Sequence, residues 1–247
     1  NTTHTDREKK MGCDIHCYAE KRDAAGKWNL IGTFSRDEPE EGSEGYASAT
    51  TVYSGRNYNL FAILADVRNG RGFAGIKTGE GFSPIAEPRG IPDDVCPEVK
   101  AIFDQWDIDG HSHSYHTLRQ LLDFDWTQTT GLQGWCNAVE WAKWSRWDRG
   151  NGNAPDSYCG GVSGMNIKHV TADEMDKLLE PVAKVYTTER ETFAEQYKET
   201  YALAQWTMTY ARAAGDAFFN DVLPRLLHEA GGTSGLDDVR IVFCFDN

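Results

Sequence analysis

The sequence predicts an α+β fold, in which a small antiparallel sheet is packed by several helices. Apolar and polar residues alternate near both ends of the chain, while segments with helical spacing lie between them. We therefore expect the N-terminal hairpin and the C-terminal strand to lie side by side in one sheet. No repeat or linker divides the chain convincingly, so 11–247 is expected to form a single domain that follows a flexible extension over 1–10.

The first half of the chain begins with strands. Cys13, Ile15 and Cys17 alternate with polar residues, a pattern that is typical of a half-buried strand over 12–21. A second strand is expected over 28–34, after a turn at 23–26. A segment rich in Glu, Gly and Ser follows and is expected to be a long loop over 35–55. The remaining predictions are helices over 58–67, 98–106 and 117–124, irregular segments over 69–81 and 84–97, and a polar, histidine-rich segment over 107–114 that is either extended or a loop.

Helices are expected through most of the second half. Thr171 and Glu174 have the spacing of a capping box, which predicts a helix up to about residue 186. The alternating Val239, Ile241 and Phe243 predict a closing strand that ends at Asp246. The other predictions are a partly helical segment over 135–147, a loop over 149–164, a long helix over 187–214, and a helix over 216–230 that Pro224 kinks or divides.

Composition excludes several classes of protein. The 247 residues carry 25 Lys and Arg against 38 Asp and Glu, a net charge of −13 that argues against broad coating of nucleic acid. No apolar run is long enough to cross a membrane, and the polar first ten residues do not resemble a secretory signal. The six cysteines are dispersed, so we expect reduced, mostly buried thiols and a cytoplasmic location.

Two groups of residues are candidate metal ligands. Asp14 and His16 are two residues apart on the polar face of the first strand, and a second group contains Asp109, His111 and His113. Carboxylate and imidazole together suit a divalent ion such as zinc, iron or manganese. We therefore predict that His16, His111 and His113 converge on one pocket. The alternatives are a solvated strand face and a polar loop whose histidines bind backbone carbonyls.

Other polar residues are candidates for catalysis and for substrate binding. Asp246 is expected to approach Asp14 or His16, because the last strand neighbours the first, and Asp109 or Asp246 would complete the metal site. His116 is expected in the first turn of a helix, as a further catalytic candidate. The candidates for binding an anionic substrate are Arg56, Asn57 and Tyr58 at a helix start, Arg71 in the glycine-rich 69–81 segment, Glu87, and Arg89. The alternative for these residues is helix capping and surface solvation.

Several segments resemble a known group of proteins. Residues 11–16 (MGCDIH), 56–62 (RNYNLFA), 84–90 (PIAEPRG) and 109–114 (DGHSHS), together with 239–247, are similar to uncharacterised proteins of tailed bacteriophages and prophages. The resemblance spans most of the chain from Met11. It implies a phage origin and expression in the host bacterial cytoplasm, and it supplies no function.

These observations support two main hypotheses. The first is a metal-dependent hydrolase that acts on a phosphate-containing substrate, such as a nucleotide or a nucleic-acid end, with zinc or manganese bound by Asp14, His16, His111 and His113. The second is a non-catalytic phage protein that binds a nucleotide signal or a host defence protein. A virion-associated structural protein is a third option.

Overall fold

The protein is described by a computed structural model that covers residues 12–37, 45–106, 109–147, 149 and 152–246. The chain divides into two compact units. Unit 1 comprises 1–69, 83–125 and 214–247, and unit 2 comprises 70–82 and 126–213. The sequence predicts one domain over 11–247, whereas the structure has two units, because the inserted segments of unit 2 build a sheet of their own. The predicted extension over 1–10 lies outside the described residues.

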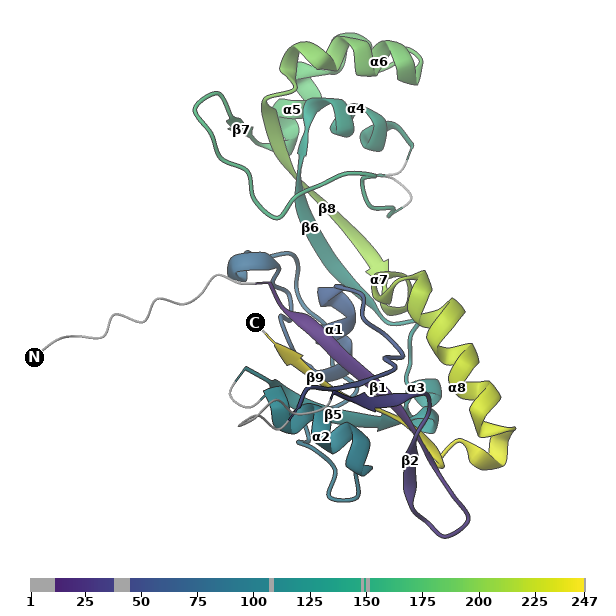
Figure 1. Cartoon of the computed structure of the whole chain (residues 1–247). Helices are drawn as coiled ribbons and strands as arrows, with labels where there is room; N and C mark the ends of the chain where they lie inside the picture. Colours follow the sequence, from purple (N-terminus) through teal and green to yellow (C-terminus); the bar gives the residue numbers. More distant parts are fainter. Residues whose placement is uncertain (1–11, 38–44, 107–108, 148, 150–151, 247) are drawn as a thin grey trace, which may run out of the picture. The chain divides into compact units, whose positions relative to one another are not determined.

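Unit 1 contains a four-stranded antiparallel sheet with the order β2-β1-β9-β5 (Figure 1). Strand β9 lies between β1 and β5 and pairs with β1 from Asp14–Asp246 to Lys21–Val239. The predicted α+β class is therefore confirmed, as is the placement of the N-terminal hairpin and the C-terminal strand in one sheet. The strands are β1 (Asp14–Arg22), β2 (Trp28–Leu30), β5 (His111–Thr117) and β9 (Val239–Asp246).

Helices cover both faces of this sheet. Phe245 packs against Phe61 of α1 with 5.0 Å between ring centroids, whereas Tyr18 packs against Phe103 of α2 at 5.8 Å. Alternation along the strands sends these residues to opposite faces, since Tyr18 pairs with Val242, an odd number of residues from Phe245. The helices of unit 1 are α1 (Tyr58–Ala65), α2 (Pro97–Trp106), α3 (Leu118–Asp123) and α8 (Leu223–Ala230), the last preceded by a π-helical turn over Phe218–Val222.

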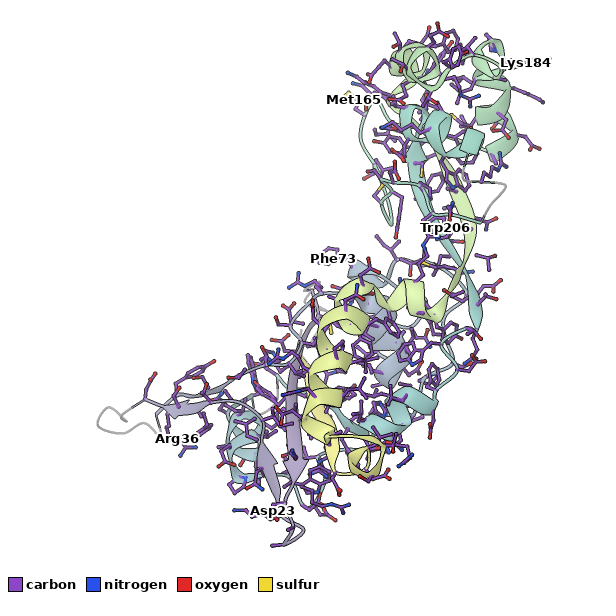
Figure 2. All side chains as sticks on the ribbon, turned by 90° about the vertical axis from the view of Figure 1, so that its right-hand side faces the viewer. Asp23, Arg36, Phe73, Met165, Lys184 and Trp206 are labelled. Atoms are coloured by element: carbon purple, nitrogen blue, oxygen red, sulfur yellow. The ribbon has the colours of Figure 1, made fainter. Side chains whose placement is uncertain are left out.

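Unit 2 is built on a three-stranded sheet with the order β6-β8-β7, in which β6 and β8 are antiparallel and β7 is parallel to β8. Its core contains Trp141, Trp144 and Met175, each no more than 2% exposed. Figure 2 marks Trp206 on β8. The elements are β6 (Thr129–Asn137), α4 (Ala138–Trp147), β7 (Lys168–Val170), α5 (Ala172–Leu178), α6 (Thr187–Ala194), β8 (Thr200–Thr209) and, across the boundary of the units, α7 (Tyr210–Ala214).

The long helix predicted over 187–214 is wrong. Helix α6 ends at Ala194, and Thr200–Thr209 forms β8, which pairs with β6 from Tyr201 to Thr209. Phe193, Tyr197 and Tyr201 have helical spacing in the sequence, and this local pattern does not reveal the pairing with a distant strand. The polar, histidine-rich segment over 107–114 contains the start of β5, which begins at His111.

Smaller features agree with the sequence more closely. The capping box is confirmed, because Glu174 N donates to Thr171 Oγ1 at 3.2 Å and Thr171 N donates to Glu174 Oε2 at 2.8 Å. All six cysteines are reduced, and only Cys159 is not fully buried. The prediction of a long loop over 35–55 is wrong in part, because β3 (Phe34–Arg36) and β4 (Ala47–Ala49) pair with each other. Among the described residues, no helix has the length and apolar character needed to span a membrane.

Candidate functional site

The ends of β1 and β9 bring acidic and basic side chains together in unit 1. Asp14 N donates to Asp246 Oδ1 at 3.1 Å, and His16 Nε2 lies 3.2 Å from Asp246 Oδ2. The antiparallel register places Asp14 opposite Asp246, so residues 232 positions apart become neighbours. Asp246 thus meets both Asp14 and His16, as the sequence predicts. We refer to Asp14, His16, Arg56 and Asp246 as the Asp14 cluster.

Arg56 forms a bidentate pair with Asp14 through one edge of its guanidinium group. Its Nε donates to Asp14 Oδ1 at 2.7 Å, and its Nη2 donates to Asp14 Oδ2. This hydrogen-bonded pair holds the pKa of Asp14 below its usual value. Gly12 makes room for the guanidinium, because a Cβ atom on Gly12 would lie 2.8 Å from Arg56 Nη1. The cluster is partly exposed: the exposed fractions are 45% for the Asp14 side chain and 19% for that of His16.

At the start of α1, two of the predicted substrate-binding residues make hydrogen bonds within the fold. Asn57 Oδ1 accepts hydrogen bonds from Asn59 N and Leu60 N, so its side chain is the N-cap of the helix. Tyr58 Oη accepts a hydrogen bond from Cys13 N at 3.1 Å. The capping alternative therefore accounts for Asn57, whereas Arg56 projects into the Asp14 cluster.

A second arginine lies beside this site. The guanidinium carbon of Arg68 is 5.7 Å from the centroid of the Tyr58 ring. Burial raises the pKa of the Cys13 thiol, and the adjacent Arg68 opposes this shift. Asp66 and Arg68 both have left-handed backbone conformations, with φ of 58° and 56°. Non-glycine residues rarely adopt this conformation, and such strain is enriched at functional sites.

The two histidines of the predicted metal pocket lie on opposite faces of the sheet. The ring of His111 stacks on Phe245 at 6.1 Å, on the α1 face, whereas the ring of His113 contacts Phe103 of α2 at 5.1 Å. The cause is a β-bulge between His111 and Ser114, at which Ser112 has a φ of 50°. One extra residue in β5 reverses the alternation that would otherwise place both histidines on one face.

His16 has an aromatic neighbour that the sequence analysis missed. Its ring lies 4.1 Å from that of Trp106, the last residue of α2. Trp106 Nε1 and His113 Nε2 are both buried and have no hydrogen-bond partner among the described residues. No local signal in the sequence links Trp106 to His16, because their contact depends on the packing of α2 against the sheet.

His116 lies in the core at the far end of β5, away from the Asp14 cluster. Its Nε2 donates to Leu64 O at 2.7 Å, and Arg89 Nη2 donates to its Nδ1. Burial lowers the pKa of His116 to about 4, so the ring is neutral near pH 7. His116 pairs with Ile241, five residues before Asp246, which is about 16 Å along the strand. His116 and Arg89 therefore form a pair of their own, in which Arg89 also lies over Tyr115 at 4.7 Å.

The remaining candidates are dispersed. Asp109 and Glu87 are exposed side chains of unit 1. Arg71 belongs to unit 2, where its Nη1 donates to Gly75 O at 3.3 Å. The glycine-rich segment around Arg71 is held to β6, since Gln133 N donates to Thr78 O and Glu80 N donates to Gly131 O, each at 2.8 Å.

The described residues contain no group of three or more His, Cys, Asp or Glu side chains placed to hold a metal ion. The Asp14 cluster instead consists of the Asp14–Arg56 ion pair and a hydrogen bond between His16 and Asp246. Comparison with known proteins found no match to a protein-family model, to a curated protein or to a solved structure. Inferences about function therefore depend on the geometry of the site.

Proposed function

We propose that the chain hydrolyses a phosphate-containing substrate, such as a nucleotide or a nucleic-acid end, at the Asp14 cluster. The observation that supports this most is the meeting of Asp14, His16 and Asp246 beside Arg56 at a partly exposed end of the sheet. Carboxylate and imidazole groups are ligands for divalent metals, and a guanidinium group binds phosphate in a bidentate manner.

In this proposal each side chain has a chemical role. Asp14, His16 and Asp246 do not form a ready metal site, because both oxygens of Asp14 bind Arg56. Once Arg56 releases Asp14, the three side chains would hold zinc or manganese, and the metal would supply a Lewis acid for the phosphoryl group and a water of lowered pKa. Arg56 exchanges its contact with Asp14 for the substrate phosphate, and Arg68 adds a second positive charge nearby. His111 and His113 are not required, because the β-bulge directs them to opposite faces.

The test is an assay of metal-depleted protein with p-nitrophenyl phosphate and its bis-ester, to which manganese or zinc is added back. Asp246→Asn should lower kcat/KM at least about a hundredfold, since it weakens metal binding and the support of His16. Asp238→Asn is the matched control, because Asp238 pairs with Arg22 at the opposite end of β1. Equal activity in both variants, or no activity with either metal, would contradict the proposal.

A second candidate function is binding without catalysis, as expected for a phage protein that captures a nucleotide signal or a host defence protein. The observation that favours it is that both oxygens of Asp14 already bind Arg56. Such a site can bind an anion without a metal. Nucleotide binding measured by calorimetry in the presence of EDTA, without turnover, would support this function over the hydrolase.

A further inference from the structure

A cavity of about 370 Å³ lies within unit 2, apart from the residues discussed above. It lies beside the junction between β6 and α4, next to the segment 195–198 that precedes β8. Asn137 pairs with Tyr201 across the two strands, and Trp135 is two residues before Asn137, so all three share one face of the sheet. The side chains that matter are those of Trp135, Tyr201, Glu140, Glu195 and Lys198.

Glu140 is a buried carboxylate without a positive partner. It is 8% exposed, and its Oε1 accepts a hydrogen bond from Asp156 N at 2.8 Å. In the part of the chain that the structure describes, no basic side chain forms an ion pair with it; Lys143, on the same helix, pairs with Glu191 instead. Glu140 lies in the first turn of α4, where the helix dipole stabilises a negative charge but supplies no full positive charge. A buried charged group normally has a counter-charge beside it, so we expect a cationic ligand next to this carboxylate.

The rest of the cavity suits an organic cation better than a hydrated metal ion. Trp135 and Tyr201 are half-buried aromatic residues, and Trp135 is fixed by an edge contact with His169 at 4.6 Å. Aromatic faces attract alkylammonium groups. Glu195 adds a second negative charge and Lys198 one positive charge, so the ionisable lining residues sum to about −1.

We propose that this cavity binds an alkylammonium group, with Glu140 as its counter-ion and Trp135 and Tyr201 as its aromatic walls. The inference is independent of the proposed hydrolase, since every residue of the cavity belongs to unit 2.

The experiment compares choline with its uncharged isostere, 3,3-dimethyl-1-butanol, by calorimetry on the full chain. Choline should bind at least about tenfold more tightly than the isostere, because only choline gains the ion pair and the cation–π contact. Glu140→Gln should remove this preference while keeping the acceptor for Asp156 N. Lys198→Ala should leave choline affinity equal or higher, because it removes a like charge.

A second readout keeps the test independent of the variants. Cys159 lines the same cavity and is the one cysteine that is not fully buried. Bound choline should slow its alkylation by iodoacetamide, whereas the isostere should do so only at higher concentration. Equal affinities for the two compounds, no choline binding up to about 10 mM, or lost affinity in Lys198→Ala would overturn the proposal.

Discussion

The β1–β9 pair carries a carboxylate–arginine ion pair toward each of its ends, and the two ion pairs differ in how exposed they are to solvent. At one end Asp14 pairs with Arg56, and both side chains are about half-exposed. Toward the other end Glu20 pairs with Arg240, at 0% and 3% exposure. Arg240 also donates to Asp94 Oδ1 at 2.7 Å and lies 3.9 Å above the Trp28 ring, so the buried guanidinium has a partner on every side.

The comparison shows that burial, rather than the type of residue, separates a structural ion pair from a candidate site. Glu20 accepts hydrogen bonds from both Arg240 and Cys96 N, so neither carboxylate oxygen is left for a ligand. Asp14, by contrast, has water as an alternative partner, and Arg56 can leave it at little cost.

The largest effect is expected at the buried pair. Arg240→Met should lower the free energy of unfolding by about 3–5 kcal/mol, because it leaves the Glu20 carboxylate buried without a counter-charge. Urea denaturation followed by circular dichroism measures this. The double variant Glu20→Gln with Arg240→Met should recover part of the loss, since the amide still accepts from Cys96 N. If Arg240→Met lowers the free energy of unfolding by less than about 1 kcal/mol, the buried ion pair contributes no more to stability than an exposed one.

The next effect concerns His116, which pairs with Ile241 beside Arg240. Burial, with a smaller contribution from the nearby Arg89, lowers its pKa to about 4. As pH falls below about 6.5, this histidine becomes protonated in the unfolded chain, whereas in the folded chain it stays neutral until about pH 4. Stability is therefore present above pH 6.5 and is lost as pH falls toward 4, by about 3 kcal/mol in total.

Denaturation curves at several pH values test this, with His116→Gln as the matched variant. The difference in stability between the parent and the variant should shrink over this pH range, because glutamine does not titrate. If the two curves stay parallel, His116 does not titrate as its burial indicates.

Gly12→Ala tests the exposed end with a smaller change. The new methyl group would lie 2.8 Å from Arg56 Nη1, and the flexible arginine should move away from Asp14. The pKa of Asp14 should then rise toward its usual value, which carbon-detected NMR measures, and kcat/KM for a phosphate ester should fall about tenfold. Arg56→Gln should give the same rise in pKa. An unchanged Asp14 pKa in Gly12→Ala would mean that glycine is not needed for this pair.

The smallest effect is expected for Asp238→Asn, which breaks the exposed pair with Arg22. Both side chains are about two-fifths exposed, so the loss should stay below about 1 kcal/mol and shrink further at high salt. Thermal melts at low and high ionic strength measure it. A larger, salt-independent loss would show that exposure does not weaken ion pairs in this sheet.

Much of unit 1 could be predicted from the sequence, and less of unit 2. The alternation of Val239, Ile241 and Phe243 identified β9, and β1 was its best partner, so the approach of Asp246 to Asp14 followed. Strand β8 was missed because its aromatic residues continue the helical spacing of α6. Its pairing with β6, more than 60 residues away, stabilises the strand, and a local pattern contains no information about that pairing.

The sequence by itself determined the strands at the chain ends, the capping box at Thr171 and the polar face that carries Asp14 and His16. These features depend on periodicity and on contacts between near neighbours. Only the tertiary structure decided that His111 and His113 face opposite ways, that Trp106 lies against His16, and that Glu140 is buried beside two aromatic rings. The physical reason is that a bulge, a helix packing on a sheet and a cavity all arise from contacts between residues that are far apart in the chain.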